Sequence, residues 1–164
     1  MRCKGPILCL AVDLRFELDD LTRPAIIAFL EEHLEDMHAV SPPESVHALD
    51  LTGLRGQDVA FWSAWEGESL AGCGALKDHG DGTYELKSMR TSSGGRGRGV
   101  GSALLRFLLD QARVRGAARV LLETGSEEYF APARRLYARH GFEVRGPFAD
   151  YTDDPNSVYM ELAL

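Results

Sequence analysis

The stretch Arg96-Gly97-Arg98-Gly99-Val100-Gly101 lies between a predicted strand, residues 83–89, and a predicted helix that opens at Ser102. Glycines at such a junction allow an anion to approach the backbone closely. The free N–H groups and the dipole at the start of the helix attract negative charge. The two arginines add positive charge and forked hydrogen-bond donors. The stretch is therefore predicted to bind a pyrophosphate.

Two other phosphate-binding motifs do not fit the spacing of these glycines. A dinucleotide fingerprint that began at Gly97 would need glycine or alanine in place of Ser102, and one that began at Gly95 would need glycine in place of Val100. A nucleotide P-loop would need lysine directly after Gly99. The pattern thus favours neither NAD nor ATP as the ligand. The alternative to a phosphate-binding loop is that these glycines only form a flexible surface loop.

Outward from this loop, the spacing of apolar residues predicts the surrounding elements. Strands are predicted over residues 7–12, 59–65, 70–77, 83–89, 120–122, 142–144 and 158–162, and helices from Pro24, Ser102 and Pro132. Helices interspersed with mainly antiparallel strands predict a mixed α/β (α+β) fold, in which helices flank a central sheet. Trp62 and Trp65 should face opposite sides of one strand, so we expect only one of them in the core.

The composition, 45% apolar and 26% charged residues, predicts one globular domain over residues 1–164. A net charge of −7 gives no support for nucleic-acid binding. No apolar run is long enough to cross a bilayer. Cys3, Cys9 and Cys73 lack paired spacing and are expected to be reduced thiols. These features predict a cytoplasmic protein without nucleic-acid or membrane partners.

Two motifs carry a family resemblance. Arg96, Gly99 and Gly101 satisfy the pattern Arg/Gln-x-x-Gly-x-Gly/Ala, which resembles the coenzyme A motif of the GNAT (GCN5-related N-acetyltransferase) family. Residues 133–142, ARRLYARHGF, resemble that family's second signature, Ala-x-x-Leu-Tyr-x-x-x-Gly-Phe. The resemblance extends from about Val59 to the C-terminus, and it implies a GNAT-like fold.

The resemblance implies acetyl-CoA as the cosubstrate and no metal. Backbone groups of Met89 and Thr91 would pair with the pantetheine arm. The amides of the loop, from Arg96 through Gly97, Arg98, Gly99 and Val100 to Gly101, would hold the pyrophosphate. Tyr137 would donate a proton to the departing thiolate, a role that a phenol within reach can fill. Without the motif, Tyr137 would be interpreted as an interior aromatic residue.

A base must also remove a proton from the acceptor ammonium. Glu85 corresponds to the catalytic glutamate of some relatives, and it is the first candidate. The alternative is that Glu85 pairs with Lys87 on the same strand face, and Glu123 is then the second candidate. Many family members have an asparagine where this chain has Phe130, so a polar contact to the cofactor is either missing or supplied by Ser126.

The segment Asp150-Tyr151-Thr152-Asp153-Asp154-Pro155-Asn156 joins the last two predicted strands, and in the family this connection often borders the acceptor site. Its carboxylates and aromatic ring could hold an ammonium group, although a solvated acidic turn has the same composition. His33, His38 and His47 fit no zinc motif and are expected to face solvent. The alternative for His47, with Glu44, is the border of the acceptor pocket.

Taken with the resemblance, the sequence predicts an acyltransferase that moves an acetyl group from acetyl-CoA to a primary amine of a small molecule, by direct attack in a ternary complex. A polyamine or an amino-acid derivative is the expected acceptor, and the resemblance allows a homodimer. The alternatives are a noncatalytic module that senses coenzyme A, and acetylation of a protein or peptide amine.

Overall fold

The computed structural model describes residues 12–164. The predicted strand over residues 7–12 lies outside this range apart from Val12, which is not in a strand. The elements are β1 Arg15–Leu18, α1 Pro24–Val40, η1 Pro43–Ser45, α2 Leu51–Leu54, β2 Val59–Glu66, β3 Ser69–Asp78, β4 Thr83–Thr91, η2 Ser93–Gly95, α3 Val100–Val114, β5 Arg119–Gly125, η3 Glu128–Phe130, α4 Ala131–Arg139, β6 Glu143–Arg145 and β7 Ser157–Ala163. From α1 onward this order matches the predicted one, and the short β1, α2 and 3₁₀ turns are additions.

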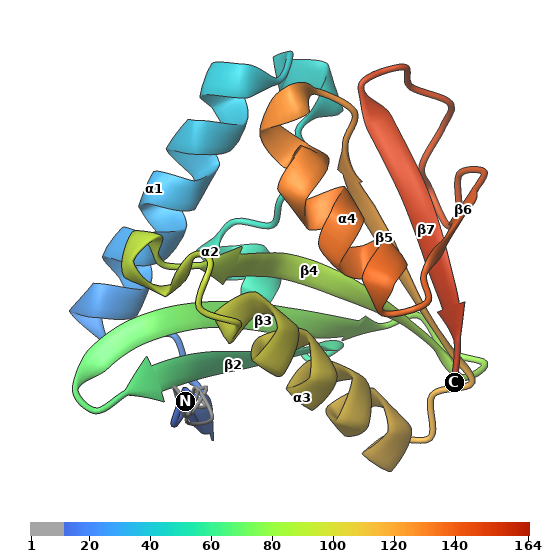
Figure 1. The fold of residues 1–164 in the computed structure, drawn as a ribbon. Helices are drawn as coiled ribbons and strands as arrows, with labels where there is room; N and C mark the ends of the chain where they lie inside the picture. The colour runs from blue at the N-terminus through green and yellow to red at the C-terminus, as the bar shows by residue number, and fades with distance from the viewer. Residues whose placement is uncertain (1–11) are drawn as a thin grey trace, which may run out of the picture.

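The strands form one seven-stranded sheet in the order β1-β2-β3-β4-β5-β7-β6 (Figure 1). Neighbouring strands are antiparallel except for β4 and β5, which are parallel and joined through α3. This arrangement confirms the mixed, mainly antiparallel sheet flanked by helices. No helix within residues 12–164 combines the length and the apolar character needed to span a membrane.

Both faces of the sheet are covered by helices. Leucines of α3, such as Leu104 and Leu108, pack with Trp62 and with Tyr137 of α4 on one face. Ile26 of α1 packs with Trp65 on the other. Both tryptophans are consequently buried, and the expectation that only one of them lies in the core was wrong. The sequence pattern of one strand does not reveal that a second helical layer covers its far side.

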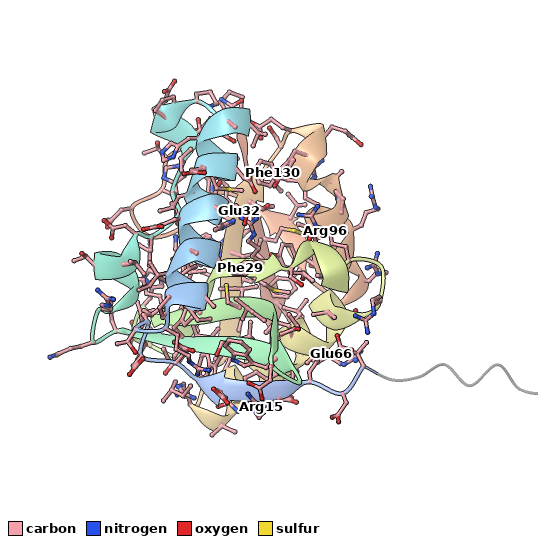
Figure 2. The ribbon with its side chains drawn as sticks, turned by 90° about the vertical axis from the view of Figure 1, so that its left-hand side faces the viewer. Arg15, Phe29, Glu32, Glu66, Arg96 and Phe130 are labelled. Atoms are coloured by element: carbon pink, nitrogen blue, oxygen red, sulfur yellow. The ribbon has the colours of Figure 1, made fainter. Side chains whose placement is uncertain are left out.

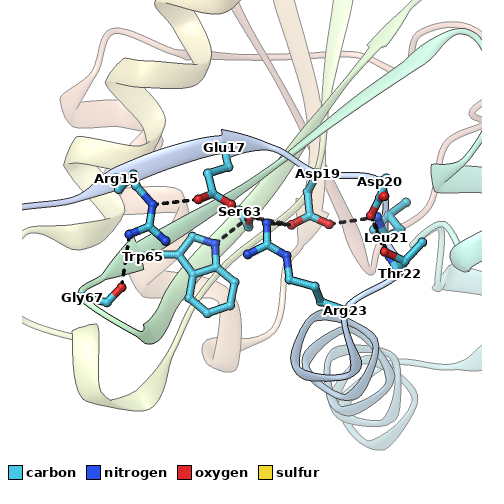
Figure 3. Close-up of polar contacts among 10 residues, drawn as sticks. All are labelled: Arg15, Glu17, Asp19, Asp20, Leu21, Thr22, Arg23, Ser63, Trp65 and Gly67. Carbon is cyan, nitrogen blue, oxygen red and sulfur yellow. Dashed lines mark hydrogen bonds and ion pairs between the residues drawn. The ribbon is translucent and has the colours of Figure 1, made fainter.

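The start of α1 is fixed by a buried polar cluster (Figure 3). Asp19 accepts hydrogen bonds from the backbone N–H of Leu21, at 2.9 Å, and from the hydroxyl of Ser63, at 2.7 Å. The indole N–H of Trp65 donates to the same hydroxyl at 2.8 Å. Arg23 pairs with Asp19 at 3.1 Å and lies over the Trp65 ring. These contacts hold α1 against β2.

Strands β4 and β5 diverge after a short paired segment (Figure 1). Their last pair is Leu86 with Leu122. Two residues later Ser88 has a φ of 51°, in the left-handed region, and the register with β3 shifts there. A bulge of this kind bends the strand away from its neighbour. Among residues 12–164, the end of β4 therefore has no strand partner on its β5 side.

Candidate active site

A cavity of about 610 Å³ lies where β4 and β5 diverge. Its wall includes the ends of both strands, the glycine-rich loop, the start of α4, part of α1 and residues 45–48. Figure 2 shows α1, with Phe29 and Glu32, beside the loop that carries Arg96. The glycine-rich loop and the helix that begins about 70 residues earlier in the chain thus border the same space.

The glycine-rich loop has the geometry of an anion cradle. Gly97 and Gly99 have φ of 73° and 84°, a conformation that favours glycine. A Cβ at either position would meet no atom within 4 Å, so the space above them is open. Gly99 is the residue before α3, and the first N–H groups of a helix have no partner within it. The loop therefore presents free donors toward the cavity.

Six of the eight residues expected to bind the cofactor line this cavity: Met89, Thr91, Arg96, Gly97, Gly99 and Gly101. Val100 is fully buried beneath the loop, where only its backbone N–H could serve a ligand. Arg98 forms a bidentate pair with Glu66, at 2.7 and 2.9 Å, and does not line the cavity. Both partners are about half exposed, so this pair contributes little to stability.

The unpaired end of β4 and the loop form one continuous surface. Met89 and Thr91 offer backbone donors and acceptors along the β4 edge, and the loop follows directly in the chain. Across the cavity stand Pro132, Ala133 and Leu136 of α4. An extended amide chain that ends in a diphosphate fits this shape, because the strand edge pairs with amides and the helix start accepts phosphate.

Tyr137 lies in α4, is 8% exposed, and lines the cavity. Burial, together with the nearby charge of Glu123, raises the pKa of its phenol to about 12. The phenol is thus protonated at neutral pH and can donate a proton to a strongly basic neighbour. Its ring packs against Phe142, with 5.7 Å between centroids, so packing fixes the orientation of the side chain.

Glu123 also lines the cavity, near the end of β5. Burial raises the pKa of its carboxyl from an ordinary 4.5 to about 7. The positive charge of Lys87 opposes this rise, and the charges of Glu85 and Asp154 add to it. A carboxyl with a pKa near neutrality can both take and release a proton at physiological pH.

Glu85 does not line the cavity, and its side chain is 3% exposed. Its carboxylate accepts hydrogen bonds from Tyr151, at 2.5 Å, and from Lys87, at 3.2 Å, and contacts the His79 ring at 2.7 Å. The alternative that Glu85 pairs with Lys87 is confirmed. Lys87 lines the cavity, so Glu85 stands behind it.

Phe130 lines the cavity and packs tightly on Gly125, where a Cβ would lie 2.1 Å from its ring. Ser126 is exposed, does not line the cavity, and donates to the backbone carbonyl of Pro155 at 2.7 Å. Of the two alternatives, a missing polar contact to the cofactor or one supplied by Ser126, this arrangement favours the missing contact.

No residue of the acidic segment 150–156 lines the cavity. Tyr151 is directed at Glu85 and Lys87 instead. Of the three histidines, His38 is exposed as expected, but His33 and His47 line the cavity, so their expected exposure was wrong. Among residues 12–164, no group of three or more His, Cys, Asp or Glu side chains could hold a metal ion.

Comparison with known proteins identifies relatives. The family model described as "Acetyltransferase (GNAT) family" matches residues 26–142. The uncharacterised N-acetyltransferase YsnE of Bacillus subtilis (strain 168) is 50% identical over 90% of this chain and 97% of its own length. The IAA acetyltransferase of Azospirillum brasilense is 39% identical over 85% of this chain and 88% of its own. An acetyltransferase from Bacillus subtilis in complex with CoA has the same fold, with a TM-score of 0.65 and 21% identity over 93% of this chain and 99% of its own.

Proposed function

The chain belongs to the acetyltransferase (GNAT) family, and on that premise we propose that it transfers an acetyl group from acetyl-CoA to the primary amine of a small molecule. The observation that carries the proposal is that one cavity brings the expected cofactor-binding residues together with Glu123 and Tyr137. Its wall includes the unpaired β4 edge and the glycine-rich loop as well as Glu123 and Tyr137. Both substrates can therefore be bound together, and the transfer proceeds by direct attack in a ternary complex.

In this proposal the β4 edge and the loop hold acetyl-CoA. Met89 and Thr91 pair with the amides of the pantetheine arm, and the N–H groups of residues 96–101 bind the pyrophosphate. Arg96 and Arg139 also line the cavity and offer guanidinium donors to the phosphates. Acetyl-CoA supplies an acyl group that is already activated as a thioester. The protein's contribution is then to position the two substrates and to move protons.

Glu123 is the base that we propose for the acceptor amine. It lines the cavity, and its pKa of about 7 matches the task. Its ionised form takes a proton from the ammonium, and the free amine attacks the thioester carbonyl. The role of Glu85 as the base, which the sequence suggested first, stays an untested prediction. The burial of its carboxylate behind Lys87 supports a role through Lys87 rather than direct contact with the amine.

Tyr137 completes the proton balance. As the new C–N bond forms, the C–S bond breaks, and the sulfur leaves with the bonding pair. The phenol donates its proton to this thiolate, and the nitrogen loses its second proton to solvent as the amide forms. The phenolate then regains a proton from solvent, and Glu123 releases its own. The high pKa of Tyr137, about 12, keeps the phenol protonated until the thiolate develops.

A small acceptor suits a cavity of about 610 Å³, and the relative from Azospirillum brasilense is named an IAA acetyltransferase. The test is to mix the protein with acetyl-CoA and a panel of primary amines. We expect free thiol and an equal amount of acetylated amine, measured by mass spectrometry. Coenzyme A binding without turnover of any amine would favour the noncatalytic alternative. Turnover restricted to peptides would favour a protein acceptor.

A further inference from the structure

The cavity wall includes basic side chains besides those expected to bind the cofactor. We use the name acceptor end for the wall formed by His33, His47, Lys87, Arg90 and Glu123. Lys87 and Arg90 are basic residues of this wall, and the only carboxyl among these five residues, Glu123, has a pKa of about 7. Each of these two basic side chains has acidic partners outside the wall, Glu85 for Lys87 and Glu32 with Asp36 for Arg90, so hydrogen-bond donors rather than net charge distinguish the acceptor end.

Lys87 has no donor left for a ligand. Its ammonium donates to the Glu85 carboxylate at 3.2 Å, the Tyr151 hydroxyl at 2.9 Å and the His47 carbonyl at 3.1 Å. An ammonium has three N–H donors, and these three contacts use them all. Lys87 thus contributes charge to the acceptor end but no hydrogen bond.

Arg90 is in the opposite situation. Its side chain is 9% exposed and lies under α1, with its guanidinium carbon 4.9 Å from the centre of the Phe29 ring. Its Nη2 pairs with Glu32 at 2.9 Å and Asp36 at 3.1 Å, on the exposed side of α1. Its Nε and Nη1 are buried and have no hydrogen-bond partner among residues 12–164.

Buried donors without partners are rare because each costs free energy, and the cost is higher for a charged group. Arg90 is moreover placed on the cavity wall beside His33. Burial and the charge of Arg90 lower the pKa of His33 to about 4. The His33 ring is therefore neutral and does not compete with Arg90 for an anion. A planar anion is the group that a guanidinium with free N–H donors recognises best.

We propose that the acceptor carries a carboxylate as well as the reacting amine, and that Arg90 binds this carboxylate. The inference rests on the proposed function and narrows its substrate to amino acids and their close analogues. The amine lies toward Glu123, and the carboxylate lies toward Arg90. A polyamine lacks the carboxylate that the free donors of Arg90 would bind.

Matched acceptors test the inference. Each amino acid in a panel is compared with its carboxamide and its decarboxylated amine, in the presence of acetyl-CoA. We expect kcat/KM to be about 10- to 100-fold higher for the acid, mostly through KM. In parallel, calorimetry on the CoA-loaded protein measures binding of the N-acetylated acid and of its amide.

Variants identify the residue responsible. Arg90→Gln should remove the preference for the acid and leave coenzyme A affinity intact, which also shows that the variant folds. Arg90→Lys should restore part of the preference. Arg113→Gln, at an exposed arginine of α3 that pairs with Asp110, is the matched control and should change nothing.

An equal response to acid and amide, in turnover and in binding, overturns the inference, as does a preference that survives in Arg90→Gln. The proposed function fails separately, when no amine is acetylated although coenzyme A binds. In that case the binding measurement still decides between the presence and the absence of an Arg90-dependent carboxylate site.

Discussion

Replacing Glu123 with glutamine should make the protein more stable and less active. Both effects have one cause, the burial of a carboxyl that must ionise to act as a base. Burial raises the pKa of Glu123 in the folded protein to about 7, whereas in the unfolded chain it is near 4.5. Glutamine has nearly the same shape and never ionises, so it removes the cost of ionisation and also removes the base.

The size of the stability effect follows from the two pKa values. They differ by about 2.5, which at about 1.36 kcal/mol per pH unit amounts to about 3 kcal/mol. Below pH 4.5 the group is protonated in both states and costs nothing. Between pH 4.5 and 7 the unfolded chain loses the proton first, so the free energy of unfolding falls as the pH rises. Above pH 7 the whole cost is present.

Urea unfolding of the wild type and of Glu123→Gln at pH 8 and pH 5 measures this difference. We expect the variant to be about 3 kcal/mol more stable at pH 8, and less than about 1 kcal/mol more stable at pH 5. The same two proteins are assayed for acetyl transfer. The wild type should lose kcat/KM for the amine as the pH falls through about 7, and the variant should be about 10²- to 10⁴-fold slower without that limb.

Two results would refute the reasoning. A gain in stability of the same size at both pH values would show that it does not come from ionisation. An acidic limb near pH 7 that persists in Glu123→Gln would show that another group is the base.

Four further substitutions have definite expected outcomes. Gly99→Glu should abolish coenzyme A binding in calorimetry, because it adds bulk and negative charge to the cradle. The control Gly80→Glu, at a turn glycine with a similar φ of 82°, should leave binding intact. Unchanged affinity of Gly99→Glu argues against the cradle. Tyr137→Phe should lower kcat with little change in coenzyme A affinity, since the proton is needed only as the thiolate leaves, and an unaltered kcat would exclude this role. Glu85→Gln should keep the acidic limb near pH 7, and its loss would restore Glu85 as the base. Arg98→Ala should weaken coenzyme A binding by less than about tenfold, because the guanidinium of Arg98 is already hydrogen-bonded to Glu66. A larger loss would show that Arg98 turns toward the cofactor.

The glycine-rich loop and the order of the elements could be predicted because both depend on local sequence. Gly99 precedes a helix with an apolar stripe, and the spacing of such residues is enough to predict the local conformation. The divergence of β4 and β5 could not be predicted, because it depends on a bulge at Ser88, and serine is not a residue that marks a left-handed backbone. The unpaired edge at Met89 and Thr91 was expected only through the family resemblance.

The candidate residues for proton transfer show the same limit of prediction from sequence. The alternation of a strand places Glu85 and Lys87 on one face, but it does not show that Tyr151, 66 residues further along, covers the carboxylate. Glu123 was only the second candidate for the base, because local sequence does not show such long-range packing. Helix α1 contributes His33 to the cavity wall. This position depends on long-range packing of α1 against Arg90, and no local signal in the sequence indicates it.

A crystal structure of the protein with coenzyme A and an N-acetylated product tests the central claim most directly. We expect the pantetheine amides to pair with the backbone of Met89 and Thr91, and the pyrophosphate to lie on residues 96–101. The sulfur should lie within hydrogen-bond reach of the Tyr137 hydroxyl, with the product nitrogen on the side of Glu123. A coenzyme A molecule bound away from the β4 edge, or a product nitrogen remote from Glu123, would contradict the account.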